Sequence, residues 1–361
     1  MEEPKFIEDK EITMLQITDL TANLGEFSLN NLNLHVQPGE YFVILGPTGA
    51  GKTILLELIA GIYSADEGKI ILHYQDITNK PPRDRPVSMV YQDYMLFPHL
   101  TVKENIRFGL ESEKYPKNQI DEKITPMIDL LNISDLLHRY PRTLSGGEKQ
   151  RATLVRSLVM DPKLLLLDEP VSALDVPTQE KIRWELKKIH KETSVTIMHV
   201  THSREEAIRL GNRIGIMNNG KIVQTGDSSQ VFKEPNSEFV AHFVGTENIF
   251  DGKARVDDGI AEIELENGIK LVALSNKTGP VKVCIRPEEI IVSTKHIEAS
   301  ERNNLKGKII GVSEREITIQ LRADVGVDLV ATITKKSYSD MELKVGKEIY
   351  FAFKATAVHL I

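Results

Sequence analysis

The strongest determinant of fold in this chain is a glycine-rich segment, Gly46–Thr53 (GPTGAGKT). It follows the apolar run Tyr41–Leu45 (YFVIL) and precedes the helix-forming run ILLELIAG. This is the pattern G-x-x-x-x-G-K-[ST] in the strand, turn and helix context that gives it meaning. Glycines let backbone N–H groups turn inward around a phosphate, and the start of a helix adds partial positive charge. We therefore predict a phosphate-binding loop between a buried strand and a helix.

The residues expected to contact a nucleotide in this loop are Gly46, Pro47, Thr48, Gly49, Ala50, Gly51, Lys52 and Thr53. Lys52 is expected to reach the β- and γ-phosphates, and the Thr53 hydroxyl a Mg²⁺ ion. The pattern alone is also compatible with an ordinary glycine turn. The flanking strand and helix favour ATP and Mg²⁺ as the cofactors.

A second motif, Leu164–Pro170 (LLLLDEP), places two carboxylates at the end of an apolar run. Phosphoryl transfer requires mainly positioning and charge neutralisation. We expect Asp168 to hold Mg²⁺ through water and Glu169 to orient and partly deprotonate the attacking water. Two acids that merely close a strand are the alternative, which an intact phosphate loop upstream disfavours.

Short apolar runs alternate with helix-like stretches from Met14 to about Pro235. Near-continuous apolar strands between helices are typical of a parallel sheet covered on both faces. The expected strands are Tyr41–Leu45, Val87–Tyr91, Leu164–Leu167, Val195–Val200 and Ile214–Met217, and the expected helices include Lys52–Ala60, Gly147–Met160, Thr178–Glu192 and Arg204–Leu210. The predicted fold class is thus an α/β P-loop NTPase domain.

The pattern changes after Phe232–Phe239 (FKEPNSEF) to short runs of period two separated by Gly, Asn or Asp turns. We interpret this part as an all-β domain of small barrels or sandwiches; the resemblance to importer tails described below implies oligonucleotide-fold-like barrels. The predicted organisation is a flexible N-terminal extension over 1–13, a nucleotide-binding domain over 14–245 and a β-rich regulatory domain over 246–361, the last divided into half-repeats 250–295 and 300–361.

Composition excludes several classes of protein. The formal net charge is −7 and there is no basic run, which argues against a nucleic-acid partner. The single cysteine, Cys284, excludes an internal disulfide framework and fits a reducing compartment. The acidic N-terminus lacks the apolar segment of a secretory signal, and no apolar run reaches the ~18–20 residues of a membrane span.

A third motif, Leu144–Arg151 (LSGGEKQR), precedes Asp168. Ser145, Gly146 and Gly147 at the start of a helix form a second nest of donors of phosphate size. Read alone, SGG is a loop and a helix N-cap. Because one nucleotide does not need two complete nests, the second one implies a second subunit.

Together these motifs resemble the nucleotide-binding subunits of ABC transporters, over Met14 to about Gly245. GPTGAGKT is similar to Walker A, LLLLDE to Walker B and LSGGE to the ABC signature. The resemblance extends to a Q-loop at Gln92, a D-loop SALD ending at Asp175 and a switch histidine at His202. It implies a head-to-tail homodimer with ATP between the Walker A of one copy and Ser145–Gly147 of the other. It also implies that Gln92 contacts Mg²⁺ and the water, and that His202 contacts the γ-phosphate.

Two positions depart from the family pattern. Relatives place an aromatic residue before the first core strand to stack on adenine, where this chain has Leu24, with Phe27 close by. The preference for ATP over GTP is therefore open. Relatives often have Asp after the switch histidine, where this chain has Ser203, and we expect a small effect on the switch.

The β region carries a second resemblance, to the molybdate-binding mop domain and the TOBE-type tails of importer ATPases. It rests on CIRPEE (Cys284–Glu289), SERNNLKGKIIGV (Ser300–Val312) and the later ITKKS turn. Hydroxyl groups, basic side chains and turn N–H groups could surround a tetrahedral oxyanion. The residues expected to bind it are Ser300, Arg302, Asn303, Lys336 and Ser337. Such residues also dominate solvated turns, which is the alternative.

We expect an ATPase that couples hydrolysis to an ABC importer, peripheral on the cytoplasmic face of the cell membrane. Its expected partners are two transmembrane permease subunits, a second copy of itself, an external binding protein indirectly, and molybdate or tungstate at the C-terminal domain. A sulfate, sugar, polyamine or iron importer shares this cassette and remains an alternative. An oxyanion sensor with a vestigial cassette is a more distant alternative. A soluble ABC protein that acts on DNA or ribosomes is disfavoured, because such proteins usually contain a coiled-coil insertion and this sequence has no heptad run.

Overall fold

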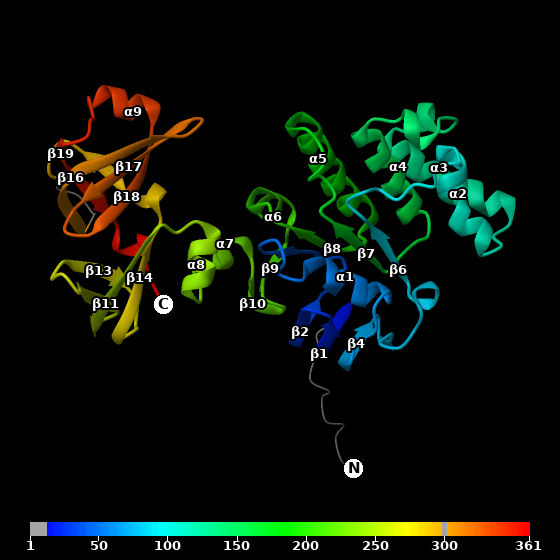
Figure 1. Cartoon of the computed structure of the whole chain (residues 1–361), viewed down its shortest axis with the longest axis horizontal. Helices are drawn as coiled ribbons and strands as arrows, with labels where there is room; N and C mark the ends of the chain where they lie inside the picture. Colours follow the sequence, from blue (N-terminus) through cyan, green and yellow to red (C-terminus); the bar gives the residue numbers. More distant parts are fainter. Residues whose placement is uncertain (1–12, 298–301) are drawn as a thin grey trace, which may run out of the picture. The chain divides into compact units, whose positions relative to one another are not determined.

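The computed structural model describes residues 13–297 and 302–361. The chain divides into two compact units, one ending at Ser228 and the other spanning Ser229–Ile361 (Figure 1). The predicted boundary at 245/246 differs because the segment 229–245 packs with the β region. The His359 ring lies 2.9 Å from the Pro235 carbonyl oxygen, and Lys282 pairs with Glu238 at 3.3 Å. The predicted N-terminal extension falls almost entirely outside the described residues.

The strands of the first unit are β1 (Leu15–Leu24), β2 (Phe27–Val36), β3 (Tyr41–Leu45), β4 (Glu67–Leu72), β5 (Gln75–Asp76), β6 (Val87–Val90), β7 (Leu164–Asp168), β8 (Thr196–Thr201), β9 (Arg213–Asn218) and β10 (Lys221–Gly226). Its α-helices are α1 (Lys52–Ala60), α2 (Val102–Ser112), α3 (Lys117–Leu131), α4 (Gly146–Leu158), α5 (Val176–Thr193) and α6 (Arg204–Leu210), with α7 (Ser228–Lys233) at the boundary. Short 3₁₀ turns are η1 (Pro82–Asp84), η2 (Ser134–Leu136) and η3 (Pro141–Thr143).

The main sheet of this unit has the strand order β10-β9-β3-β8-β7-β6. Its strands pair in parallel from β9 to β6, and β10 pairs antiparallel with β9 at the edge. Every residue of β3, β7 and β8 is buried, as their continuous apolar runs predict. Parallel strands end at one edge of the sheet, so the phosphate loop, Asp168 and the residues after Thr201 share that edge.

A second sheet, β2-β1-β4-β5, was not predicted. The reason is a pair of register shifts in β1 between Ile17 and Ala22, with Asp19 at φ 50°. Such bulges interrupt the period-two pattern that identifies a half-buried strand. The apolar face of this sheet shares one core with α1 and the central strands.

Helices α2, α3 and α4 pack on one another, and α4 contacts β6 at the edge of the six-stranded sheet (Figure 1). Helix α2 begins with a capping box formed by Thr101 and Glu104. Helix α3 contains Pro126 in its interior, a residue that ordinarily marks a loop. The sequence analysis identified α4 but neither α2 nor α3.

The second unit contains α8 (Glu238–Val244), β11 (Asn248–Asp257), β12 (Ile260–Leu265), β13 (Lys270–Leu274), β14 (Gly279–Ile285), η4 (Pro287–Glu289), β15 (Ile291–Ser293), β16 (Asn303–Glu314), β17 (Thr318–Asp324), β18 (Asp328–Thr334), α9 (Lys335–Asp340), β19 (Glu348–Phe353), η5 (Ala355–Ala357) and β20 (Val358–Leu360). The strands form two five-stranded sheets around one apolar core. Their orders are β13-β12-β11-β14-β20 and β15-β19-β16-β17-β18.

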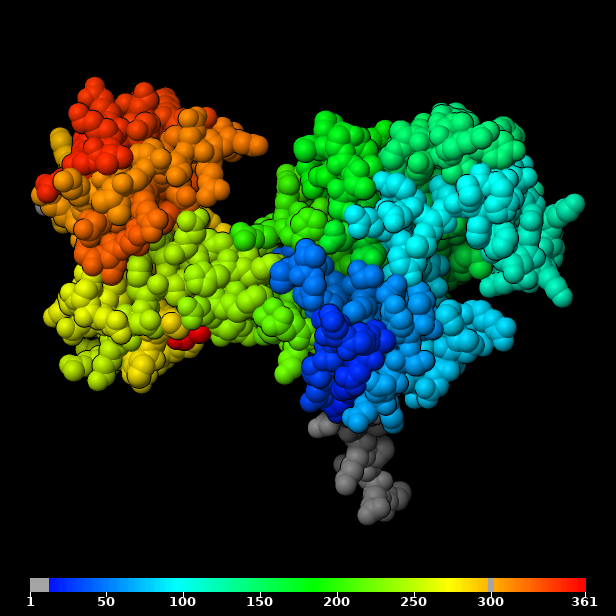
Figure 2. Space-filling model, viewed as in Figure 1, coloured from blue at the N-terminus to red at the C-terminus, as the bar shows by residue number. Residues whose placement is uncertain are grey.

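These two sheets exchange their last strands. β15 comes from the first half of the region but pairs with β19, whereas β20 comes from the second half but pairs with β14. In Figure 2 a red patch of C-terminal residues accordingly lies within the yellow surface of the first half. Apart from α9, which has no counterpart between β13 and β14, the two halves have the same element order, with the 3₁₀ turns η4 and η5 in matching positions.

No helix in the described ranges 13–297 and 302–361 combines the length and the apolar character of a membrane span.

Candidate nucleotide site

The phosphate loop connects the end of β3 to the start of α1, as predicted. Two of its glycines are required by space. A Cβ on Gly46 would lie 2.4 Å from the Met217 carbonyl oxygen, and one on Gly51 would lie 2.2 Å from the Phe27 ring. Gly51 also has φ +99°, in the left-handed region that favours glycine.

Lys52 curls back over this loop. Its ammonium group donates to the carbonyl oxygens of Gly46 at 2.9 Å and Pro47 at 3.0 Å, and the residue is only 6% exposed. Burial lowers the pKa of Lys52, while the charges of Glu169 and Asp168 act in the opposite direction. Lys52 is therefore held at the loop by two hydrogen bonds, within the electrostatic influence of Glu169 and Asp168.

Thr53 and Asp168 meet directly at the carboxyl edge of the sheet. The Thr53 hydroxyl lies 3.0 and 3.1 Å from the two carboxylate oxygens of Asp168. Burial raises the pKa of Asp168, and the hydrogen bond from Thr53 opposes this shift. A buried carboxylate beside a hydroxyl is an oxygen donor set of the kind Mg²⁺ prefers alongside phosphate, so the residues fit that ion. No cluster of three His, Cys, Asp or Glu side chains suited to a metal occurs among the described residues.

Glu169 and His202 form a second contact at the same edge. His202 Nδ1 lies 3.0 Å from Glu169 Oε2. The backbone N–H of Glu169 donates to the Val200 carbonyl oxygen at 3.0 Å, with the residue at φ +45°. A non-glycine residue in the left-handed region is uncommon and is held there by its surroundings. Glu169 is thus fixed toward β8 and the switch histidine that follows it.

The signature residues lie elsewhere in the unit. Ser145 caps α4 in a capping box with Glu148, and Cβ atoms on Gly146 and Gly147 would approach Leu174 and Thr178 within 2.7 and 2.8 Å. These contacts join the signature turn to the end of the D-loop and the start of α5. These contacts of Ser145–Gly147 are thus with α4, the D-loop and α5, and Lys52 takes no part in them.

Asp175 acts as the N-cap of α5. It accepts hydrogen bonds from the N–H of Thr178 at 3.1 Å and from its hydroxyl at 2.9 Å, which lower the pKa of Asp175. Gln92 is exposed in the turn after β6, next to Tyr91, whose hydroxyl donates to Glu57 at 3.4 Å. Gln92 is thus at the edge of the sheet but turned to solvent.

The predicted oxyanion residues are partly accounted for by a structural role. Ser300 lies outside the described residues. Asn303 is 2% exposed, and its amide donates to the Val272 and Phe353 carbonyl oxygens and accepts from the Val272 N–H at 2.7 Å. Because these bonds occupy the amide, Asn303 joins strands of the two sheets, and we leave it out of the proposed oxyanion set.

Asn248 plays the same part in the other sheet. Its amide donates to the Ile285 and Val330 carbonyl oxygens and accepts from the Val330 N–H at 2.7 Å. The sequence analysis missed Asn248. The signal was the repeated pattern Asn-x-apolar-x-Gly-Lys at 248–253 and 303–308.

Arg302 and Lys336 are exposed, and Ser337 is half-buried at the start of α9, where its N–H donates to the Thr334 hydroxyl. The residues of this set that the structure describes thus lie in two segments, Arg302 and Asn303 at the start of β16 and Lys336 and Ser337 in α9.

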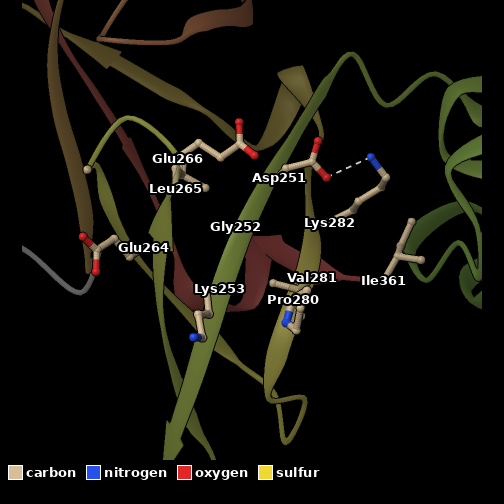
Figure 3. Close-up of a pocket in the computed structure, with 11 residues that line it drawn as sticks. Asp251, Gly252, Lys253, Glu264, Leu265, Glu266, Pro280, Val281, Lys282 and Ile361 are labelled. Atoms are coloured by element: carbon tan, nitrogen blue, oxygen red, sulfur yellow. Dashed lines mark hydrogen bonds and ion pairs between the residues drawn. The ribbon is translucent and has the colours of Figure 1, made fainter.

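A separate cavity of about 950 Å³ lies on β11, β12 and β14 of the second unit (Figure 3). It is lined by acidic and basic side chains, including the ion pair of Asp251 with Lys282 at 2.9 Å. The nucleotide motifs contribute no residue to it.

Comparisons with known proteins agree with this geometry. The ABC transporter family matches residues 29–172, and the TOBE domain family matches residues 299–360. The chain is 44% identical to the molybdate/tungstate import ATP-binding protein WtpC of Pyrococcus abyssi, over 96% of this chain and 99% of that protein. It is 36% identical to the spermidine/putrescine import ATP-binding protein PotA of Vibrio cholerae, over 82% of this chain and 79% of that protein.

Among solved structures, a dimeric ATP-binding cassette in a post-hydrolysis state with ADP and Pi shares 29% identity. It covers 60% of this chain and 99% of its own, with a TM-score of 0.52. The fold and the phosphate-loop site define an ATP-binding cassette with an all-β TOBE domain. The chain belongs to the ATP-binding proteins of ABC transporters, which are ATPases coupled to transport, and its similarity extends over almost its whole length to the molybdate/tungstate import proteins.

Proposed function

We propose that this chain hydrolyses MgATP with Glu169 as the residue that orients and polarises the attacking water. The supporting observation is the convergence of Lys52, Thr53, Asp168, Glu169 and His202 at one edge of the sheet. Thr53 and Asp168 would hold Mg²⁺, which supplies charge neutralisation for the β- and γ-phosphates.

Each side chain has a separate task in this scheme. Lys52 and the N–H groups of the phosphate loop bind the phosphates. Glu169 accepts a hydrogen bond from the water. His202, within hydrogen-bond distance of Glu169, orients the Glu169 carboxylate and donates toward the γ-phosphate. Gln92, which is exposed at this edge, is proposed to contact Mg²⁺ and the water.

The signature residues require a second copy. Gly146 and Gly147 lie against Leu174 and Thr178 of their own chain, and Ser145 is bonded to Glu148. We infer a head-to-tail homodimer in which this turn and Asp175 meet the nucleotide of the partner. The dimeric cassette among the similar structures supports this arrangement.

One experiment tests both the water-orienting role and the dimer. Glu169→Gln should lower kcat for ATP hydrolysis by at least about a hundredfold and leave ATP binding intact, because the amide accepts but cannot take a proton. With ATP and Mg²⁺, light scattering should show twice the mass of one chain for this variant. Wild-type kcat in Glu169→Gln would overturn the water-orienting role, and a single-chain mass with ATP bound would overturn the dimer.

The transported substrate is proposed to be molybdate or tungstate, which would cross the membrane through two permease subunits. This chain would bind those subunits at the cytoplasmic face of the membrane. The similarity to the import proteins of Pyrococcus over both units supports this choice over the polyamine import proteins, whose identity is lower. Sulfate, sugar and iron import remain the other candidates.

The C-terminal region is proposed to bind the same oxyanion and to inhibit transport when it accumulates, through Ser300, Arg302, Lys336 and Ser337. A ligand that favours one state biases the equilibrium toward it. Calorimetry of the full chain with molybdate, tungstate and sulfate tests the proposal. Micromolar affinity for molybdate or tungstate, at least about tenfold tighter than for sulfate and weakened in Arg302→Gln, is expected. Absence of binding would reject the regulatory site, while ATP hydrolysis would be unaffected.

A further inference from the structure

A buried polar network lies beside the nucleotide site and takes no part in the scheme above. Its centre is Glu206 of α6, which is 4% exposed. A carboxylate this deeply buried is costly unless several partners compensate it. The partners come from α5 and β8 and include residues on both sides of the switch histidine.

The first group of partners surrounds His202. The Thr201 hydroxyl donates to Glu206 at 2.8 Å and accepts from the Ser203 N–H at 3.0 Å. The Ser203 hydroxyl in turn accepts from the Glu206 N–H at 3.3 Å and caps α6. Both neighbours of His202 are thus bonded to Glu206.

The second group leads to the D-loop. Arg183, 6% exposed on α5, reaches the other carboxylate oxygen of Glu206 at 3.4 Å. It also donates to Gln179 at 3.1 Å, and the Gln179 amide donates to the Leu174 carbonyl oxygen at 2.9 Å. An unbroken series of contacts therefore runs from the switch segment to the D-loop.

The third partner is His199, which is fully buried on β8. Its Nε2 lies 3.3 Å from Glu206, and its Nδ1 lies 3.0 Å from the hydroxyl of Tyr41. Tyr41 begins β3, the strand that ends at the phosphate loop. Burial on its own would raise the pKa of Glu206, but His199, Thr201 and Arg183 together lower it, so the carboxylate stays charged.

We propose that Glu206 is a positioning residue for ATP hydrolysis, which through Thr201 and Arg183 holds His202 in a fixed relation to the D-loop. It does not touch the nucleotide. It acts on the orientation of His202, whose ring must meet both Glu169 and the γ-phosphate. Small displacements of such groups reduce turnover more than binding.

The test is steady-state ATP hydrolysis by the full chain. Glu206→Gln and Arg183→Met should lower kcat by about tenfold, with KM for ATP changed less than about threefold. Arg183→Lys restores the charge and should recover at least about a third of kcat. The control is Arg209→Gln. Arg209 lies on α6, as Glu206 does, and its exposed ion pairs are with Glu180 and Glu205. The kcat of this variant should stay within about twofold of wild type.

A second pair of variants remains informative if a charge change prevents folding. Thr201→Val is isosteric and removes the hydroxyl that joins Glu206 to Ser203, whereas Thr201→Ser keeps it. We expect the low kcat in Thr201→Val and near-normal kcat in Thr201→Ser. Unchanged kcat in folded Glu206→Gln or Thr201→Val, or a change confined to KM, would overturn the positioning role. It would leave the proposal for Glu169 standing, since that rests on Glu169→Gln alone.

Discussion

Glu169 shows at the scale of one residue how the sheet prepares the site. It follows the last residue of β7, and its left-handed backbone turns the side chain toward His202 instead of continuing the strand. Such a conformation costs about 1–2 kcal/mol for a residue with a Cβ. The hydrogen bonds of its N–H and of its side chain offset that cost.

Cys284 is a buried thiol of the second unit. Burial raises the pKa of its thiol to about 12. At pH 8 only about one thiol in ten thousand is then ionised, against roughly a quarter for an ordinary cysteine. We expect iodoacetamide to modify the native chain at least about a thousandfold more slowly than the chain in urea, as measured by mass spectrometry.

The same shift gives a pH dependence of stability. Because folding raises the pKa of Cys284, its contribution is complete below the ordinary thiol pKa of about 8.5 and is lost as pH rises toward 12. In Cys284→Ala this part of the pH dependence should disappear. Rapid alkylation of the native protein at pH 8 would contradict the assignment.

Arg85 acts at the scale of an element, because it completes the C-terminal end of α1. Its guanidinium donates to the carbonyl oxygens of Leu58 at 2.7 Å and Ile59 at 2.9 Å, and also to those of Lys80 and Thr78. A cation at a helix C-terminus satisfies carbonyl groups that lack partners within the helix. The loop that follows β5 is thereby fastened to the helix that begins at Lys52.

Arg85→Met should therefore lower the free energy of unfolding of the first unit by about 2–4 kcal/mol, since two buried and two partly buried carbonyl groups lose a charged donor. Urea denaturation followed by circular dichroism measures the change. Arg83→Met is the matched control, because the side chain of Arg83 is 86% exposed and pairs with Asp84 at only 3.7 Å. The control should stay within about 0.5 kcal/mol of wild type. Equal losses in both variants would contradict the role of Arg85.

The elements of the nucleotide site could be predicted because each rests on a local pattern. β3 and α1 have the predicted bounds, and the strand before Glu169 is one residue longer than predicted. The sheet β2-β1-β4-β5 was not predicted because bulges interrupt its period-two pattern, and α3 was not predicted because Pro126 lies in its interior. The network around Glu206 depends on residues distant in sequence, whose proximity no local pattern reports. Asn303 was predicted as an oxyanion ligand because it is a polar residue in a turn-like motif. In the structure it is buried, and its amide is bonded to strands of both sheets.

At the scale of the whole molecule, the exchange of β15 and β20 makes the two halves of the second unit interdependent. Leu360 of β20 is 2% exposed, faces the common core and pairs with Val283 of β14. A charge at this position would disturb the sheet formed by the first half, although Leu360 belongs to the second.

Leu360→Asp should accordingly increase deuterium uptake in β14 (Gly279–Ile285), as measured by hydrogen exchange and mass spectrometry. The control is Lys354→Gln, at an exposed position shortly before β20. It should leave β14 protected from exchange. Uptake confined to β16–β19 in the Leu360→Asp variant would show that the halves are independent.

The exchanged strand also has a consequence for aggregation. As long as Val358–Leu360 is not in place, the edge of β14 that it covers stays open. Open edges invite pairing with other chains. The first sheet of the second unit is therefore complete only when the segment that follows β19 has docked, and a form of the protein with β20 displaced would expose an edge prone to aggregation.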